Sequence, residues 1–420
     1  MKISIIGCGY VGTVTGAGFA ELGNEVLFVD IDEEKINTLN SARSPIFELG
    51  LEELIVKNKG RLHATVDYRE LEYSDITFIC VGTPSKADGS IDLKYIKSAA
   101  EDIGKVLEKK TNFHVVVVKS TVVPGTTEEV VRPIIESVSH KKAGDDFGLA
   151  MNPEFLREGS AVEDFFKPDR IVFGVEDERS KRTLEELYQP FSGPKLSTGI
   201  KTAEMIKYVS NSFLATKISF ANEIGNICKR LGIDAYDVFK GVGLDGRINP
   251  SFFRAGIGFG GSCFPKDVRA LIAKAEELGE TPQILKAVIT ANDEQPLRLV
   301  TVLKKHIPEL KGRKIGVLGL TFKPDTDDIR ESRAVPIIER LIEEEAHVVV
   351  YDPKAMDAFK KRYPQMECAS PEAVLDTDAV LIVTEWREFE SLNYTGKIVI
   401  DGRRVEKAKK EAAIYEGVCW

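Results

Sequence analysis

The stretch KISIIGCGYVG, residues 2–12, decides the fold of the N-terminal half. KISII is typical of a buried strand, and the glycines that follow have the spacing Gly7-x-Gly9-x-x-Gly12. Apolar residues at helical spacing continue to Gly23, and a second strand-like run, EVLFVDID, contains Asp30. Strand, glycine turn, helix, strand and acid in this order predict a dinucleotide-binding α/β unit.

The parts of this turn have separate predicted roles. Gly7 makes the tight turn, Gly9 lets the main chain approach a pyrophosphate, and Gly12 lets the helix pack on the strand. The helix N-terminus faces the phosphates. Asp30 is expected to bond a ribose 2′-hydroxyl, which favours NAD over NADP as the cofactor. The turn residues predicted to contact NAD are Gly7, Gly9, Tyr10, Val11 and Gly12.

Three further strand-like runs follow, DITFICVGTP, HVVVVKST and FGLAMNPEF. Ligands of open α/β sheets bind at the carboxyl ends of the strands. Thr83, Thr121 and Glu154 stand at such ends and are candidate site residues, with strand-end capping as the alternative. Lys35 is either an adenosine contact or a solvated helix residue.

The C-terminal part repeats the plan of the start. KIGVLGLTFK mirrors KISIIGCGYV, HVVVYDPK mirrors EVLFVDID, and DAVLIVTEW mirrors DITFICVGT. The chain therefore carries two predicted doubly wound α/β halves, and the second lacks the full glycine pattern. Lys323, Arg330 and Arg403 are candidate phosphate ligands by charge and reach, or else solvated surface cations.

A long helix is predicted between the halves, from about Lys201 to Gly232, with further helices to about Leu310. It is a connector and a candidate dimerisation surface. Lys207 and Asn211 are four residues apart, so both side chains face one way and are able to bind an oxyanion, or they form an exposed polar stripe. We therefore expect an NAD-binding domain at 1–198, a central helical domain at 199–310 and a second Rossmann-like domain at 311–420.

GFGGSCFPKD, residues 258–267, places a cysteine directly before a predicted helix. Exposed N–H groups and the helix dipole at this position favour a thiolate at Cys263 and are able to hold an oxyanion, whereas the alternative is a small buried cysteine. Asp267 follows one helical turn later. An activated thiol beside an NAD site indicates two successive oxidations, alcohol to aldehyde and, through a thioester, to acid.

Composition limits the other classes of function. The net charge of −9 and the lack of a basic block argue against a nucleic-acid partner. The six cysteines and five histidines are scattered without zinc spacing, so no metal is expected. The start of the chain lacks the apolar core of a signal peptide, and no apolar run is long enough for a membrane span. We expect a cytoplasmic enzyme of a small-molecule substrate, without a membrane partner.

The chain resembles the UDP-glucose 6-dehydrogenases of the UDP-glucose/GDP-mannose dehydrogenase family over essentially its whole length. The resemblance is carried, in order, by the motifs GCGYVG, CVGTP, KSTV, NPEFLREG, KYVSNSFLA, GRINPSFFRAGIGFGGSCFPKD and TFKPDTDDIRES. It implies an NAD-dependent four-electron oxidation of UDP-glucose to UDP-glucuronate by a homodimer.

The resemblance also implies roles for single residues. Cys263 would be the nucleophile, and Lys207 and Asn211 would stabilise the thiohemiacetal oxygen. Asp267 with Thr121 would position a water or assist proton transfer. A further candidate base, for thioester hydrolysis, is Glu154.

The remaining implied residues bind the two ligands. On the cofactor side they are Asp30, Lys35, Thr83, Thr121, Glu158 and Arg330. For the UDP-sugar they are Glu154, Phe155, Leu156, Arg157, Lys207, Asn211, Phe259, Gly260, Phe322, Lys323 and Arg403. Arg247 resembles the residue that this family lends to the neighbouring subunit's substrate.

Four alternatives remain open at this point. GDP-mannose 6-dehydrogenases share the cysteine loop, although FFKPDRIVFG favours the UDP-glucose branch. UDP-N-acetylhexosamine dehydrogenases depart from NPEFLRE. The β-hydroxyacid dehydrogenases lack both the thiol and a second α/β half. An NAD-sensing regulator does not explain the cysteine loop.

Overall fold

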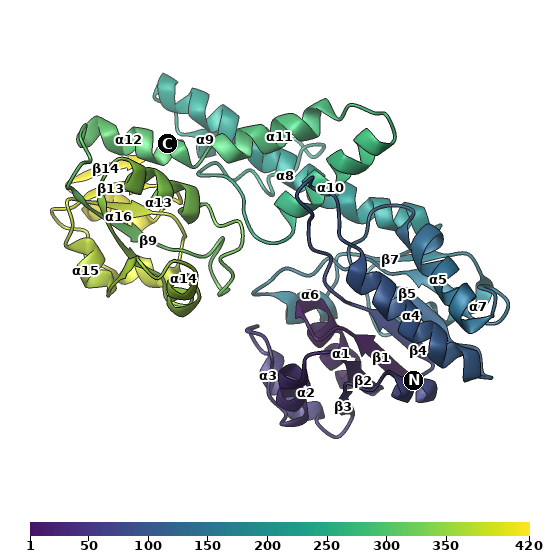
Figure 1. Ribbon diagram of the computed structural model, residues 1–420. Coiled ribbons are helices and arrows are strands. Elements are labelled where there is room, and N and C mark those ends of the chain that lie inside the picture. Colours follow the sequence, from purple (N-terminus) through teal and green to yellow (C-terminus); the bar gives the residue numbers. More distant parts are fainter. The chain divides into compact units, whose positions relative to one another are not determined.

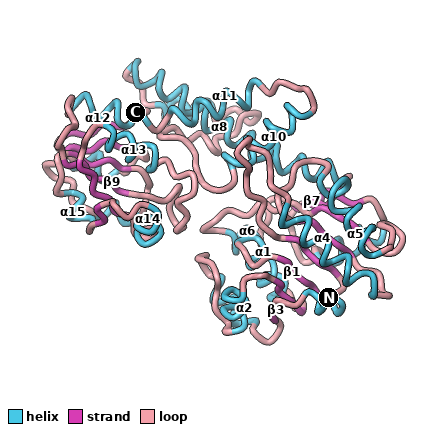
Figure 2. Tube along the Cα trace, in the orientation of Figure 1, coloured by secondary structure: helices cyan, strands magenta, loops and turns pink.

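The computed structural model describes residues 1–420 (Figure 1). Two compact units make up the chain, Met1–Ser210 (unit 1) and Asn211–Trp420 (unit 2). Each has its own mainly parallel sheet with helices packed on it, as Figure 2 shows with the strands in magenta. The predicted α/β class with two doubly wound sheets is confirmed.

Unit 1 contains an eight-stranded sheet in the order β3-β2-β1-β4-β5-β6-β7-β8. Its strands are β1 (Lys2–Ile6), β2 (Glu25–Val29), β3 (Leu62–Thr65), β4 (Ile76–Ile79), β5 (Val115–Val118), β6 (Gly148–Met151), β7 (Ile171–Val175) and β8 (Lys195–Thr198). All neighbours are parallel except β6 and β7. The helices are α1 (Tyr10–Glu21), α2 (Glu33–Asn40), α3 (Leu51–Asn58), η1 (Tyr68–Tyr73), α4 (Lys94–Lys109), η2 (Thr127–Val131), α5 (Arg132–Ser139), α6 (Ala161–Phe166) and α7 (Glu178–Leu187).

Helices cover both faces of this sheet, which explains why its central strands are buried and mostly apolar. One face packs against α1, α3, α6 and α7, and the other against α4, α5 and the first turn of α8. Phe19 of α1 lies at the centre of the first face, with its ring 5.5 Å from that of Phe78 and 5.3 Å from that of Phe165. The core therefore fixes the strand ends that carry the candidate residues.

Unit 2 contains a six-stranded parallel sheet in the order β11-β10-β9-β12-β13-β14. Its strands are β9 (Lys314–Leu318), β10 (His347–Tyr351), β11 (Glu367–Cys368), β12 (Ala379–Ile382), β13 (Ile398–Asp401) and β14 (Ile414–Gly417). The helices are α8 (Ile200–Leu231), which starts in unit 1, α9 (Ala235–Val242), α10 (Phe264–Glu277), α11 (Gln283–Glu294), α12 (Leu297–His306), α13 (Ala334–Glu343), α14 (Met356–Arg362), α15 (Pro371–Leu375), η3 (Arg387–Ser391) and α16 (Glu406–Glu411). Helix α8 is the long helix predicted from about Lys201 to Gly232.

The two sheets repeat one plan. The first six strands of unit 1 and the six strands of unit 2 have the same spatial order. Gly7 and Gly319 follow the central strands with φ angles of +99° and +97°. Their N–H groups donate to the carbonyl oxygens of Val29 and Tyr351, each at 2.8 Å. The units differ after this turn, because α1 begins at Tyr10 whereas the corresponding helix α13 is preceded by a long loop.

No helix of the structure is both long enough and apolar enough to cross a membrane.

Candidate active site

The glycine turn of unit 1 is built as the sequence predicts. A Cβ on Gly12 would lie 1.9 Å from the Gly7 carbonyl oxygen, so the packing of α1 on β1 requires glycine there. A Cβ on Gly9 would meet nothing within 4 Å. Gly9 is the N-cap of α1, and no side chain caps the helix. The open space and uncapped N–H groups fit a bound pyrophosphate, which is the expected place for the phosphates of NAD.

Asp30 stands just past the end of β2, beside this turn. Its carboxylate accepts N–H hydrogen bonds from Cys8 at 2.6 Å and from Asp32 at 3.0 Å. Two carboxylate oxygens offer about four acceptor positions, so capacity for ribose hydroxyls remains. Lys35 lies 3.8 Å from Asp32 in an ion pair, and the Tyr10 hydroxyl accepts the N–H of Gly159 at 2.9 Å. Unit 1 therefore has the parts of an NAD site.

Asp352 is the counterpart of Asp30 in unit 2, and its carboxylate is fully engaged by the protein. It is buried, and it accepts the Leu320 N–H at 2.7 Å and the Trp386 indole N–H at 3.0 Å. Further donors are the N–H and hydroxyl of Thr321 and the N–H groups of Lys354 and Ala355. This carboxylate has no room for a ribose, so unit 2 does not offer a second site of the same kind.

Glu154 follows β6 and forms a buried ion pair with Lys207 of α8. Lys207 Nζ lies 2.7 Å from Glu154 Oε1, and the two side chains are 4% and 6% exposed. The Leu156 N–H donates to the other carboxylate oxygen at 2.7 Å. Burial by itself raises the pKa of Glu154, but the Lys207 charge and these hydrogen bonds outweigh it and hold that pKa below its ordinary value. The pair therefore favours the ionised form of the Glu154 carboxylate although it is buried.

A second buried lysine stands close by in unit 1 and was not among the predicted residues. Lys119 directly follows β5, and its Nζ donates a hydrogen bond to Asn152 Oδ1 at 2.9 Å. The Tyr188 hydroxyl donates to the same oxygen at 2.5 Å. Burial lowers the pKa of Lys119 to about 8. The only signal in the sequence was a charged residue at the end of the run VVVV.

Cys263 is the N-cap of α10 and is exposed, which confirms its predicted place at the helix start. No side chain caps this helix, and a proline stands in its first turn. The Ser262 hydroxyl lies 3.6 Å from Cys263 Sγ. The thiol therefore faces solvent at the N-terminus of α10.

Asp267 lies one turn further along α10 and is buried. Its N–H donates to the Cys263 carbonyl oxygen at 2.9 Å. Its carboxylate accepts hydrogen bonds from Asn211 Nδ2 and from Lys266 Nζ, both at 2.6 Å. The structure thus joins two predicted residues, Asn211 and Asp267, that are 56 positions apart.

The glycines of the cysteine loop lie against loop 321–333 of the same unit. A Cβ on Gly260 would lie 2.2 Å from the Glu331 carbonyl oxygen, and one on Gly261 would lie 2.7 Å from the Phe322 ring. The Gly261 N–H donates to the Arg330 carbonyl oxygen at 3.1 Å. Gly260, Phe322 and Arg330, three predicted ligand contacts, are therefore neighbours.

Three arginines that are predicted to reach ligands form ion pairs with nearby acids. Arg157, Arg247 and Arg330 pair with Asp164, Asp245 and Asp328 at 2.5, 2.6 and 2.7 Å. Two further predicted contacts have local partners as well. Arg403 donates to the Val383 carbonyl oxygen at 2.8 Å, and Lys323 Nζ lies 5.6 Å from the centre of the Phe322 ring.

Five further predicted residues lie on the loops that follow the strands of unit 1. Phe155 packs under two cations, Arg170 at 3.8 Å and Lys207 at 5.6 Å from its ring centre. Thr83, Thr121, Leu156 and Glu158 are half-buried.

A doubly wound sheet with an intact dinucleotide turn, together with a thiol at a helix N-terminus, defines an NAD-dependent dehydrogenase with a candidate cysteine nucleophile. Family models match three parts of the chain. They describe the NAD binding domain (residues 1–192), the central domain (201–294) and the UDP binding domain (316–408) of the UDP-glucose/GDP-mannose dehydrogenase family. The chain belongs to this family.

Proteins similar in sequence match the whole chain. It is 48% identical to UDP-glucose 6-dehydrogenase AglM of Haloferax volcanii, with 100% of both chains covered. The structure of a UDP-glucose dehydrogenase from Pyrobaculum islandicum matches with a TM-score of 0.96 at 47% identity, over 100% of this chain and 98% of the other. GDP-mannose 6-dehydrogenase of Pseudomonas putida is 40% identical, again over 100% of both chains.

Proposed function

We propose that this protein is a UDP-glucose 6-dehydrogenase that oxidises UDP-glucose to UDP-glucuronate in two steps and uses two NAD. Membership of the family and the 48% identity to the Haloferax enzyme support the substrate. The observation that carries the two-step chemistry is the exposed Cys263 at the start of α10. A single alcohol oxidation has no use for such a thiol.

Unit 1 supplies the cofactor site of the proposal. The turn from Gly7 to Gly12 and the α1 N-terminus hold the pyrophosphate, and Asp30 holds the adenosine ribose. When bound, NAD accepts one hydride in each of the two oxidations. The remaining cofactor contacts that we propose are Lys35, Thr83, Thr121, Glu158 and Arg330.

Cys263 is the proposed covalent catalyst. After the first oxidation the substrate carries an aldehyde, and the thiolate adds to its carbon to form a C–S bond while the carbonyl electron pair moves to oxygen. Protonation of that oxygen gives a thiohemiacetal. Loss of hydride from the carbon and of the hydroxyl proton then gives a thioester. Water adds to the thioester, the C–S bond breaks, and the carboxylate leaves as the thiolate regains a proton.

Four polar residues support these steps in the proposal. Lys207 and Asn211 donate hydrogen bonds to the substrate oxygen as its charge develops. Glu154, kept ionised by Lys207, accepts a proton from the water of hydrolysis, and Asp267 with Thr121 orients that water. The proposed UDP-sugar contacts are Phe155, Leu156, Arg157, Arg247, Phe259, Gly260, Phe322, Lys323 and Arg403.

The test is the number of NADH formed per sugar nucleotide consumed, with UDP-glucose, GDP-mannose and UDP-N-acetylglucosamine compared side by side. Two NADH from UDP-glucose alone is the expected result. Two from GDP-mannose alone would move the substrate to the activity named for the Pseudomonas putida relative. One NADH from any of them would exclude the thioester route. Cys263→Ser is expected to keep NAD binding and to lose acid formation.

The proposal includes a cytoplasmic homodimer with the three-domain division predicted from the sequence. Helix α8 supports the dimer, because apolar side chains remain exposed at helical spacing along it. They are Met205, Val209, Phe213, Phe220, Ile227 and Leu231, of which Phe213 is 63% exposed. A second copy of the chain is the proposed occupant of this face.

A further inference from the structure

The last turn of α11 meets the main chain of the cysteine loop with several side chains. Asn292 is 1% exposed, its Oδ1 accepts the Phe259 N–H at 2.7 Å, and its Nδ2 donates to the Phe259 carbonyl oxygen at 3.0 Å. The Asn292 carboxamide thus bonds to both main-chain polar groups of Phe259, as a neighbouring antiparallel strand would. Gly258 permits the approach, since a Cβ there would lie 2.6 Å from Asn292 Oδ1.

The start of the loop is held in the same way. Gln295, the C-cap of α11, donates from Nε2 to the Gly256 carbonyl oxygen at 2.6 Å. Asn222 of α8 accepts the Gly256 N–H at 2.8 Å through its Oδ1. Both side chains are buried. Four main-chain groups of residues 256–259 therefore bond to side chains of α8 and of the end of α11.

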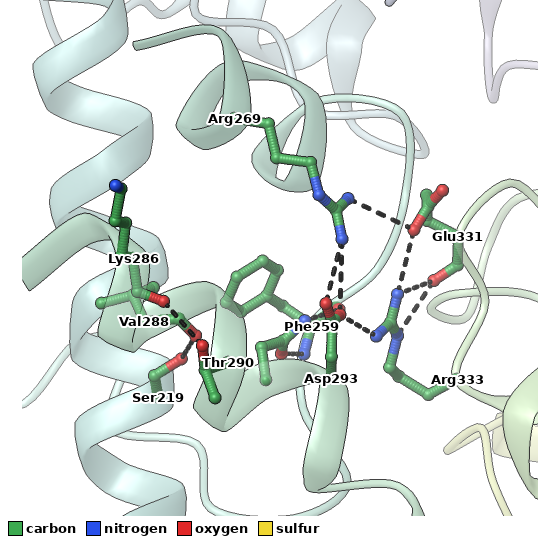
Figure 3. A network of polar contacts seen from close by, with 10 residues as sticks. Ser219, Phe259, Arg269, Lys286, Val288, Thr290, Asp293, Glu331 and Arg333 are labelled. Atoms are coloured by element: carbon green, nitrogen blue, oxygen red, sulfur yellow. Dashed lines mark hydrogen bonds and ion pairs between the residues drawn. The ribbon is translucent and has the colours of Figure 1, made fainter. Parts of the chain in front are cut away.

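Asp293, the residue after Asn292, connects the end of α11 to α10 and to loop 321–333. Asp293 accepts hydrogen bonds from Arg269 at 3.1 Å and from Arg333 at 3.4 Å (Figure 3). Arg333 is buried and also donates to the Glu331 carbonyl oxygen at 3.0 Å. Arg269 belongs to α10, the helix that Cys263 caps. Both arginines also form ion pairs with the Glu331 carboxylate, Arg269 at 3.7 Å and Arg333 at 3.3 Å. Two arginines and two carboxylates thus join α10, α11 and loop 321–333.

We infer that Asn292 and its neighbours Asp293 and Gln295 are positioning residues for Cys263. Glycine-rich main chain has many accessible conformations, and the side-chain hydrogen bonds select one of them. The selected conformation sets the direction in which the chain enters α10 and hence the place of the thiol at its N-terminus. This inference rests on the proposed function, in which Cys263 is the nucleophile.

The experiment compares wild type with Asn292→Leu and Asn292→Asp. Leucine keeps the volume but leaves the N–H and carbonyl of Phe259 without their partner. We expect the rate constant for alkylation of Cys263 by iodoacetamide, followed by mass spectrometry of its peptide, to change at least tenfold. We expect kcat with UDP-glucose to fall at least tenfold while the NAD affinity is retained.

Asn292→Asp provides a signature that a loss of stability does not produce. The introduced carboxyl group accepts and donates like the amide when protonated, but only accepts when ionised. Its activity relative to wild type should therefore rise as the pH falls. The charged groups of the neighbouring ion-pair network, Arg269, Arg333, Asp293 and Glu331, are common to both proteins.

Asn58→Leu is the matched control, because Asn58 is a buried asparagine of unit 1 whose amide donates to Glu21 and to the Leu54 carbonyl. It should lose stability but keep wild-type alkylation. The inference is overturned if folded Asn292→Leu alkylates at the wild-type rate with wild-type kcat. If that variant does not fold, a pH-independent activity ratio for Asn292→Asp overturns it. Alkylation needs no substrate, so an unchanged alkylation rate would refute only the positioning role of Asn292. A yield of one NADH per sugar nucleotide would instead refute the proposed function itself.

Discussion

Replacing Lys207 with methionine should unfold unit 1 at a much lower temperature. The Lys207–Glu154 pair is almost fully buried at 2.7 Å, and the variant would leave the carboxylate with the Leu156 N–H as its remaining direct donor. Removing one member of a buried pair costs about 3–5 kcal/mol. For a unit of this size, each kcal/mol lowers the unfolding temperature by roughly 2–4 °C, so we expect a decrease of roughly 6–20 °C at pH 7.

The pH dependence of this loss tests its cause. In wild type the pKa of Glu154 lies below its unfolded value, so the ionised carboxylate stabilises the fold above about pH 4.5 and that stabilisation disappears as the pH falls. Without Lys207 burial dominates and the pKa of Glu154 rises above the unfolded value. The folded variant then takes up a proton, and its deficit relative to wild type shrinks between neutral pH and about pH 4.5.

The assay is differential scanning calorimetry, with the transition of unit 1 recognised by its upward shift when NAD is added. The double variant Lys207→Met/Glu154→Gln is the control, because removing both charges is expected to cost less than removing one. An unfolding temperature of Lys207→Met within about 2 °C of wild type, with a deficit that does not change with pH, would refute the reasoning.

Three further predictions follow from the structure. Gly9→Ala should unfold at the wild-type temperature but bind NAD at least tenfold more weakly. Gly12→Ala should lose about 1–3 kcal/mol of stability, because its Cβ would lie 1.9 Å from a carbonyl oxygen. Equal stabilities of the two variants would contradict this prediction. Burial raises the pKa of Glu204 from 4.5 to about 7. The stability of wild type relative to the non-titrating variant Glu204→Gln should therefore fall by about 3 kcal/mol as the pH rises from about 4.5 to 7. Thermal melts in which the stability difference between the two proteins does not change with pH would exclude this prediction. Phe220→Glu should convert the proposed dimer into monomers in light scattering, and an unchanged mass would remove α8 from the interface.

Local patterns predicted much of this structure. The strand, turn and helix of residues 2–21 and the helix start at Cys263 depend on glycine, proline and apolar spacing within a few residues, and such rules act locally. The partners of the polar residues did not follow from such rules. Glu154 is 53 positions from Lys207, and Phe259 is 33 positions from Asn292, so only the packing of whole elements brings them together. Loop 321–333 carries no periodicity, and its path was not predicted.

Asp30 and Asp352 show how the same position in a fold serves either ligand binding or stability. Both carboxylates occupy the same place in the repeated sheet, but only the second has all of its acceptors satisfied by its own chain. A satisfied carboxylate stabilises the unit in which it lies and recognises nothing else. Asp30 keeps acceptor positions that its own chain does not use, so it stabilises unit 1 less but is able to bind and select a ligand. Evolving a new ligand preference in unit 2 would therefore begin with removing Thr321 or Trp386 from Asp352, and the first effect of that change would be a less stable domain.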